Sequence, residues 1–297
     1  LAEFIGAFGF ALISGADKAL IYDSLIELKK KEEGKYYLSR YEAAGTLGIL
    51  VSFPLGSLIA RANFIQYPNS LAFTFILSGL FSILALFLYI SMKEPKRRKP
   101  TENFVRLGID GLKYLHSHKA LRAFTINSVL ISAVTFFMFW FYQPLSGNVG
   151  IDIAYYGFIG AGYNLFAAIL LFNVKKLENI FGMKNLLFYS ALIPSLLLLG
   201  VAMIKNVLFV IISIFLITGL KLLRAPILSD FMNKNIESKN RATILSSVSL
   251  LERIMITMLY PIVGLLADIT ISYALIFLGI LALLFTFITR IEESHYL

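Results

Sequence analysis

The sequence contains no cysteine among its 297 residues, and it has only three histidines and one tryptophan. Without cysteine, the chain cannot form a disulfide, a thiolate metal site or a cysteine nucleophile. Charged residues are scarce as well, at 15% of the chain, whereas they make up about 25% of a typical soluble domain. Hydrophobic residues reach 58%. This composition excludes an ordinary soluble domain.

In place of a soluble pattern, the sequence has a series of long apolar segments. Crossing about 30 Å of hydrocarbon takes roughly 20 apolar residues in a helix. Five such segments contain no Asp, Glu, Lys or Arg: 71–90, 123–151, 153–174, 185–204 and 271–289. Four more carry charges that are terminal or isolated: 4–22, 43–60, 206–223 and 242–267. Transmembrane strands are shorter and alternate apolar with polar residues, so we predict an all-α polytopic membrane protein with nine transmembrane helices.

The basic residues set the predicted orientation. If the loop after the first span is cytoplasmic, 23 of the 27 Lys and Arg residues lie in cytoplasmic segments, with Lys221 and Arg224 counted at the inner end of span 206–223. Only Arg61 and Lys205 lie outside, as the positive-inside rule predicts. We therefore expect a multi-pass protein of the cell membrane with a cytoplasmic C-terminus. Its net charge of +9 follows from topology and requires no nucleic-acid partner.

A basic polar stretch divides the chain. It covers residues 93–122 and separates three spans (1–92) from six (123–297). Within it, Val105, Ile109 and Leu112 recur at helical spacing, which predicts an amphipathic helix lying in the cytoplasmic interface. We expect this stretch to be a hinge between two helical bundles.

Several strings resemble the major facilitator superfamily, in particular its small prokaryotic efflux-type members. They are SGADKALIYDSL (14–25), FYQPLSGNVGI (141–151), RAPILSDFMNKNIESKNRATILSSVSLLERI (224–254) and PIVGLLAD (261–268). The resemblance covers essentially the whole chain. It implies two six-helix bundles around a central cavity, alternating access and, often, proton coupling.

The resemblance also indicates which parts of the pattern are missing. The chain starts at Leu1, and we interpret it as N-terminally truncated, with spans equivalent to helices four to twelve of twelve. The family's glycine-aspartate-basic loop would then precede Leu1, and its second copy would be the loop KKLENIFGMK (175–184). The antiporter motif corresponds to GILVSFPLGS (48–57), which has serines where the family has glycines.

Glu252 and Arg253 are the leading candidates for chemistry. Ten helical residues after Ala242 place them about 15 Å into the membrane, where ionised groups are costly and mark ion or substrate pathways. Glu252 is predicted to carry a proton. Arg253 would pair with Glu252, with another helix or with an anionic substrate. The structural alternative is an ion pair that fixes this helix to another.

Further candidates lie in two other spans. Tyr142 and Gln143 would line the cavity, where aromatic faces can hold an apolar or cationic molecule, whereas Trp140 fits better in an aromatic belt at the outer interface. Asn164 lies among small residues, so a cross-helix hydrogen bond in close packing is favoured over substrate binding.

Charges at the cytoplasmic helix ends form a third group. By resemblance, Asp23, Asp230 and Arg241 belong to gating networks that hold the bundles in the outward-facing state. The alternative is ordinary solvation of interfacial charges. His116 and His118 lack a third ligand and make a poor metal site.

We conclude from the sequence that the chain is a secondary active transporter of a small molecule, with drug or metabolite efflux driven by protons as the expected activity. The expected partners are a small-molecule substrate, protons and the lipid bilayer, with no cofactor, no metal and a monomeric state. The alternatives from other classes are a polytopic membrane enzyme and a transporter-like receptor without flux.

Overall fold

The long apolar runs fold as helices, because in hydrocarbon every backbone amide and carbonyl must be paired within the segment. The computed structural model describes residues 5–6, 9, 13, 16–30, 33–62, 68–93, 95, 104–235 and 241–291. Over these residues all the regular elements are helices. The all-α polytopic fold predicted from the sequence is therefore confirmed.

Eight helical segments within the described residues are long and apolar enough to cross a membrane. They coincide with eight of the nine predicted spans. The ninth, 4–22, falls largely outside the described residues, although α2 (Ala16–Glu27) includes its end. Contacts divide the chain into two compact units, 1–101 and 102–297.

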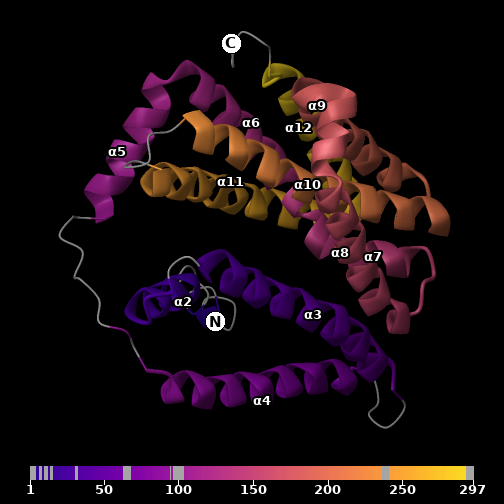
Figure 1. Cartoon of the computed structure of the whole chain (residues 1–297). Helices are drawn as coiled ribbons and strands as arrows, with labels where there is room; N and C mark the ends of the chain where they lie inside the picture. The colour runs from indigo at the N-terminus through magenta and orange to yellow at the C-terminus, as the bar shows by residue number, and fades with distance from the viewer. Residues whose placement is uncertain are drawn as a thin grey trace. The chain divides into compact units, whose positions relative to one another are not determined.

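The first unit contains α2, α3 (Gly34–Arg61) and α4 (Asn69–Ser91). Figure 1 shows α3 and α4 as two long helices connected at one end. At that connection the buried hydroxyl of Ser70 donates to the carbonyl of Ala60, 2.7 Å away. The Tyr41 hydroxyl donates to the Asp17 carboxylate and links α3 to α2.

The second unit begins with α5 (Phe104–Ser117), α6 (Lys119–Phe136) and α7 (Met138–Asn148). A short 3₁₀ turn, η2 (Ile153–Tyr155), leads to α8 (Tyr156–Phe172). The remaining helices are α9 (Val174–Met203), α10 (Val207–Asn235), α11 (Arg241–Ile269) and α12 (Ile271–Ile288). α6 to α12 gather in one bundle, and α5 lies against α11 (Figure 1). A turn at Phe137 separates α6 from α7.

Packing between α8 and α10 depends on a reciprocal pair of glycines. A Cβ added to Gly162 would lie 2.7 Å from the Phe215 ring, and one added to Gly219 would lie 2.7 Å from the Phe166 ring. On each helix, a glycine thus leaves room for an aromatic ring of the other helix. Such close approach is how membrane helices gain van der Waals contact, since lipid tails are as apolar as the side chains.

The structure corrects the prediction for residues 175–184. The sequence predicted a loop between spans, but α9 begins at Val174 and continues through this segment with one interruption at Gly182. Gly182 has φ of 74°, a backbone conformation that favours glycine because it has no Cβ. The helix therefore breaks and restarts in place of a loop.

Lys221 and Arg224, predicted from the sequence to lie at the cytoplasmic end of a span, are both on α10. This helix runs without interruption to Asn235. The Arg224 side chain is buried and that of Lys221 is half-buried, so each needs a partner within the bundle.

Candidate functional site

Glu252 lies on α11, well inside the candidate span 243–269. It follows the first residue of α11 by eleven positions, about 16 Å along the helix axis. The side chain is half-buried. An acidic side chain at this depth needs a hydrogen-bond donor or a nearby cation.

Ser132 of α6 provides the donor. Its hydroxyl lies 2.5 Å from Glu252 Oε1 and donates to it. Ser132 is thirteen positions after the first residue of α6, about 20 Å along that helix. Two helices that are far apart in the chain therefore meet at one carboxylate.

Lys221 of α10 contributes the nearby positive charge. It is half-buried and lies within electrostatic range of Glu252, without a direct ion pair between the two in the described structure. Its Nζ lies 4.9 Å from the centre of the Phe136 ring, a cation–π contact. Phe136 is one turn beyond Ser132 on the same face of α6. The ammonium group thus contacts an aromatic face, and the Glu252 carboxylate lies beyond direct contact.

Aromatic rings continue from this charged group along α6 and α11. Tyr260 is two turns beyond Glu252, and its ring centre lies 5.1 Å from that of Phe137 and 6.3 Å from that of Phe136, both edge to face. We call Glu252, Ser132, Lys221 and Phe136 the Glu252 site. It combines a protonatable carboxylate, a cation and an aromatic surface, which suits proton exchange and the binding of an apolar or cationic molecule.

Arg253 lies apart from this group. Its side chain is exposed, and within the described residues it makes no ion pair with Glu252. Of the three partners considered for Arg253, Glu252 is thus not among its described contacts. The other predicted partners of Arg253, another helix or an anionic substrate, stay predictions.

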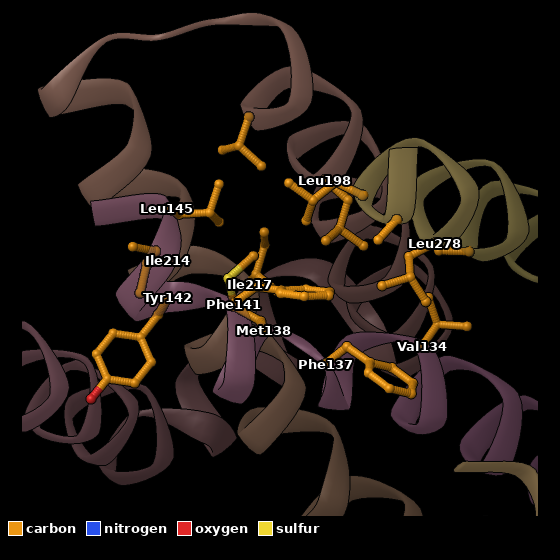
Figure 2. Close-up of a cluster of buried hydrophobic side chains, with 14 of the residues drawn as sticks. Val134, Phe137, Met138, Phe141, Tyr142, Leu145, Leu198, Ile214, Ile217 and Leu278 are labelled. Carbon is orange, nitrogen blue, oxygen red and sulfur yellow. The ribbon is translucent and has the colours of Figure 1, made fainter. Parts of the chain in front are cut away.

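Tyr142 and Gln143 form a second polar group, on α7. The Gln143 amide donates to the Tyr142 hydroxyl at 3.0 Å. The Tyr142 ring packs edge to face on Tyr163 of α8, with 5.5 Å between centres. Figure 2 shows Tyr142 at the margin of a buried apolar cluster, with its oxygen directed away from the other labelled side chains. Trp140 is half exposed, at 48%. Tyr142 and Gln143 therefore lie together, as a polar edge on an apolar core.

Asn164 faces its own helix. Its amide nitrogen donates to the carbonyl of Gly160, one turn earlier on α8, at 2.8 Å. A side chain occupied in this way contributes to local packing. The predicted cross-helix hydrogen bond of Asn164 is absent from the described contacts.

The three predicted gating residues are spread over both units. Asp23 lies on α2 of the first unit, and Asp230 is exposed near the end of α10. Arg241 begins α11, and its side chain falls outside the described part of the structure. Their gating role stays a prediction.

Sequence reasoning missed Arg224 as a structural centre. The side chain is buried on α10, at 3% exposure. Its guanidinium donates to the Leu187 carbonyl at 2.5 Å, to Ser190 Oγ at 2.9 Å and to Asn127 Oδ1. Asn127 in turn donates to the carbonyl and hydroxyl of Thr289, at 2.9 and 3.0 Å. This network joins α6, α9, α10 and the end of α12. Its sequence signal was an arginine inside a long helical apolar run.

A known protein family matches most of the chain. The model described as Major Facilitator Superfamily matches residues 3–257. A search of curated proteins finds no match. The family predicted from the sequence is thus confirmed by a match over most of the chain, and it is a family of membrane transporters.

Proposed function

The chain belongs to the Major Facilitator Superfamily, and we propose that it is a proton-driven secondary transporter that exports a small molecule. The observation that carries this proposal is the contact of Ser132 with Glu252 next to Lys221. Within the described spans, Glu252 is thus a carboxylate that can bind and release a proton close to the cation Lys221. Glu252 is the proposed proton carrier.

Protonation of Glu252 would change the balance of charge in the site. With Glu252 ionised, the ammonium of Lys221 has a counter-charge inside the membrane. With Glu252 protonated, the positive charge of Lys221 is left beside the Phe136 ring, and an uncompensated charge at this depth is unfavourable. The two protonation states therefore favour different arrangements of α6, α10 and α11, which is the requirement for coupling proton binding to a conformational change.

The proposed substrate is a small apolar or cationic molecule that contacts Phe136 and Tyr260. Aromatic faces attract cations, and in its ionised state Glu252 would attract them further. Tyr142 and Gln143 are proposed as a second contact, with the Tyr142 hydroxyl and the Gln143 amide orienting the substrate. Asn164 and Arg253 are proposed only as secondary substrate contacts. Asn164 donates within its own helix, and Arg253 lies apart from the Glu252 site.

The test uses ethidium, an aromatic cation, as the probe in vesicles containing the protein. An imposed pH gradient should drive ethidium transport by the parent protein, and Glu252→Gln should abolish the gradient-driven component. Glu178→Gln is the matched control, since Glu178 is a half-buried acid of α9 in the same unit. Normal gradient-driven transport by Glu252→Gln would refute the coupling role. Binding of ethidium without flux would instead indicate a receptor.

The gating role of Asp23, Asp230 and Arg241 is also a proposal. Because the chain has no cysteine, a single cysteine at Val248, one turn before Glu252, reports access to this part of α11. Asp23→Asn should change the rate at which Val248→Cys reacts with a water-soluble maleimide. An unchanged rate would remove Asp23 from the gate.

We further propose that the protein is a monomer in the cell membrane with its C-terminus in the cytoplasm. Single cysteines at Lys175 and Lys205 should react from opposite sides of intact cells, with Lys205 labelled from outside. Labelling of Lys175 from outside would reverse the proposed orientation.

A further inference from the structure

A basic hollow lies where α6 begins and α12 ends. It encloses about 290 Å³, and among its lining residues are Lys119, Arg122, Ile126, Ile288, Thr289 and Arg290. Three of these side chains are cations, and no carboxylate of the described residues forms an ion pair with them. Three cations placed close together favour the binding of an anion.

The two arginines are held in place by neighbouring groups. Arg122 Nη1 donates to the carbonyl of His116 at 3.0 Å. The Arg290 guanidinium lies 4.9 Å from the centre of the Phe188 ring. Each contact leaves further N–H groups of the guanidinium free to donate to an anion.

An apolar groove adjoins the basic hollow. It encloses about 250 Å³ between α6 and α11, and its lining includes Ile126, Leu130, Leu251, Met255 and Met258. Ile126 lines both hollows and is 44% exposed. A ligand lying across Ile126 would therefore place one end among cations and the other along apolar side chains.

The groove also contains a polar atom without a partner. Thr125 is among the residues that line the groove, and its hydroxyl is buried and has no hydrogen-bond partner within the described structure. Leaving a buried hydroxyl unpaired is unfavourable.

We propose that the two hollows bind one anionic phospholipid. Its phosphate accepts hydrogen bonds from Lys119, Arg122 and Arg290, and an acyl chain lies along the groove beyond Ile126. Charge complementarity selects this ligand, since a zwitterionic lipid brings an ammonium group toward three cations. Basic pockets between transmembrane helices on the cytoplasmic side are known to suit anionic headgroups.

The single tryptophan of the chain allows a direct test. In a Trp140→Phe background, Ile126→Trp places the only tryptophan where the two hollows meet. The protein is reconstituted in phosphatidylcholine vesicles with a small share of phosphatidylglycerol, and brominated acyl chains on one lipid or the other quench the fluorescence. Relative to its share of the bilayer, brominated phosphatidylglycerol should quench Ile126→Trp at least about fivefold more strongly than brominated phosphatidylcholine. This is the factor expected for one basic residue with an anionic lipid.

Two controls separate the site from the general membrane surface. Phe172→Trp, in the same background, reports a position that is 90% exposed, and there the two brominated lipids should quench in proportion to their shares of the bilayer. Replacing Lys119, Arg122 and Arg290 by Gln should abolish the preference at Ile126→Trp. Replacing Lys113, Lys175 and Lys176 by Gln removes three exposed cations elsewhere in the unit and should leave it unchanged.

Three results would overturn the proposal. The first is equal preference at Ile126→Trp and Phe172→Trp. The second is a preference that survives loss of Lys119, Arg122 and Arg290. The third is reversal of the preference by inorganic phosphate, but not by chloride of equal ionic strength, which would assign the site to a soluble anion.

Glu292 and Glu293 follow Arg290 in the sequence and lie outside the described residues. Changing both to Gln should keep or strengthen the preference for phosphatidylglycerol. A preference that appears only after this change would mean that these acids neutralise the hollow, and the lipid proposal would fail.

Discussion

Two charged groups inside the second unit have contrasting surroundings. Arg224 is buried and donates to three neutral acceptors on α6 and α9. Glu252 is half-buried and has one hydroxyl donor, Ser132, and one nearby cation, Lys221. The arginine is thus enclosed by fixed polar groups, whereas the glutamate shares its surroundings with a second ionisable group.

The difference separates a structural charge from a functional one. An arginine stays protonated in a protein, so the network around Arg224 has one stable state that joins four helices. A glutamate can gain or lose a proton, and its neighbours then experience a different charge. We therefore assign stability to the Arg224 network and proton coupling to the Glu252 site. The variants below test that division, from the largest expected effect to the smallest.

Arg224→Met should have the largest effect on stability. It leaves Asn127 Oδ1 and Ser190 Oγ without the donor they now have, and a buried polar group left unpaired costs about 1–3 kcal/mol. We expect the free energy of unfolding, measured by titration with a denaturing detergent, to fall by roughly 3 kcal/mol in total. Arg224→Lys should recover only part, because an ammonium lacks the planar fork of the guanidinium.

Lys205→Gln is the matched control for Arg224→Met. The Lys205 side chain is exposed in the connection between α9 and α10, so the expected change is within about 0.5 kcal/mol. Equal losses for Arg224→Met and Lys205→Gln would contradict the special role of the buried network.

The pair of charges in the Glu252 site should behave as a coupled unit. Glu252→Gln and Lys221→Gln each leave the other charge without its counter-charge, whereas the double variant removes both. A double-mutant cycle on unfolding should give an interaction energy of about 1–3 kcal/mol, with the double variant less destabilised than the sum of the singles. Strict additivity would mean that Lys221 and Glu252 do not interact.

Ser132→Ala should have an intermediate effect that separates the Glu252 site from general packing. It removes the hydroxyl that donates to Glu252, a charge-assisted hydrogen bond with a net contribution of about 1.5–3 kcal/mol when made to an ionised group. In a Glu252→Gln background, the same change should cost less, about 1 kcal/mol. Ser249→Ala is the control, since Ser249 is exposed and donates within its own helix.

The contact between α5 and α11 should give the smallest effect. A Cβ on Gly111 would lie 2.3 Å from Ser247 Oγ, so Gly111→Ala requires Ser247 to move. We expect faster hydrogen exchange in α5 with a change in unfolding free energy below about 1 kcal/mol, because alanine also favours the helix by about that amount. Gly111→Ala with Ser247→Ala should restore slow exchange. Fast exchange in the double variant would place the cause elsewhere.

Hydropathy and length were enough to predict the helical spans, because the bilayer fixes both. They also predicted the depth of Glu252, since position along a helix follows from residue count. The partners of Glu252 were not predicted. Ser132 and Lys221 are 120 and 31 residues away, and which faces of α6 and α10 turn toward α11 depends on packing that a single sequence does not encode locally.

The prediction for residues 175–184 was wrong for a physical reason. Residues 175–184 were assigned to a loop because they are polar, although the structure keeps them helical on both sides of Gly182. Polarity marks the membrane boundary but does not end a helix.

Infrared spectroscopy of the reconstituted chain tests the central claim most directly. Spectra recorded across a pH titration contain the C=O band of each carboxyl group as it becomes protonated. We expect that the difference between the parent chain and Glu252→Gln isolates one such band, and that Ser132→Ala shifts its frequency because the hydroxyl contact is lost. If no titrating band disappears in Glu252→Gln, then Glu252 takes up no proton over the range tested, and the proposed coupling site is contradicted.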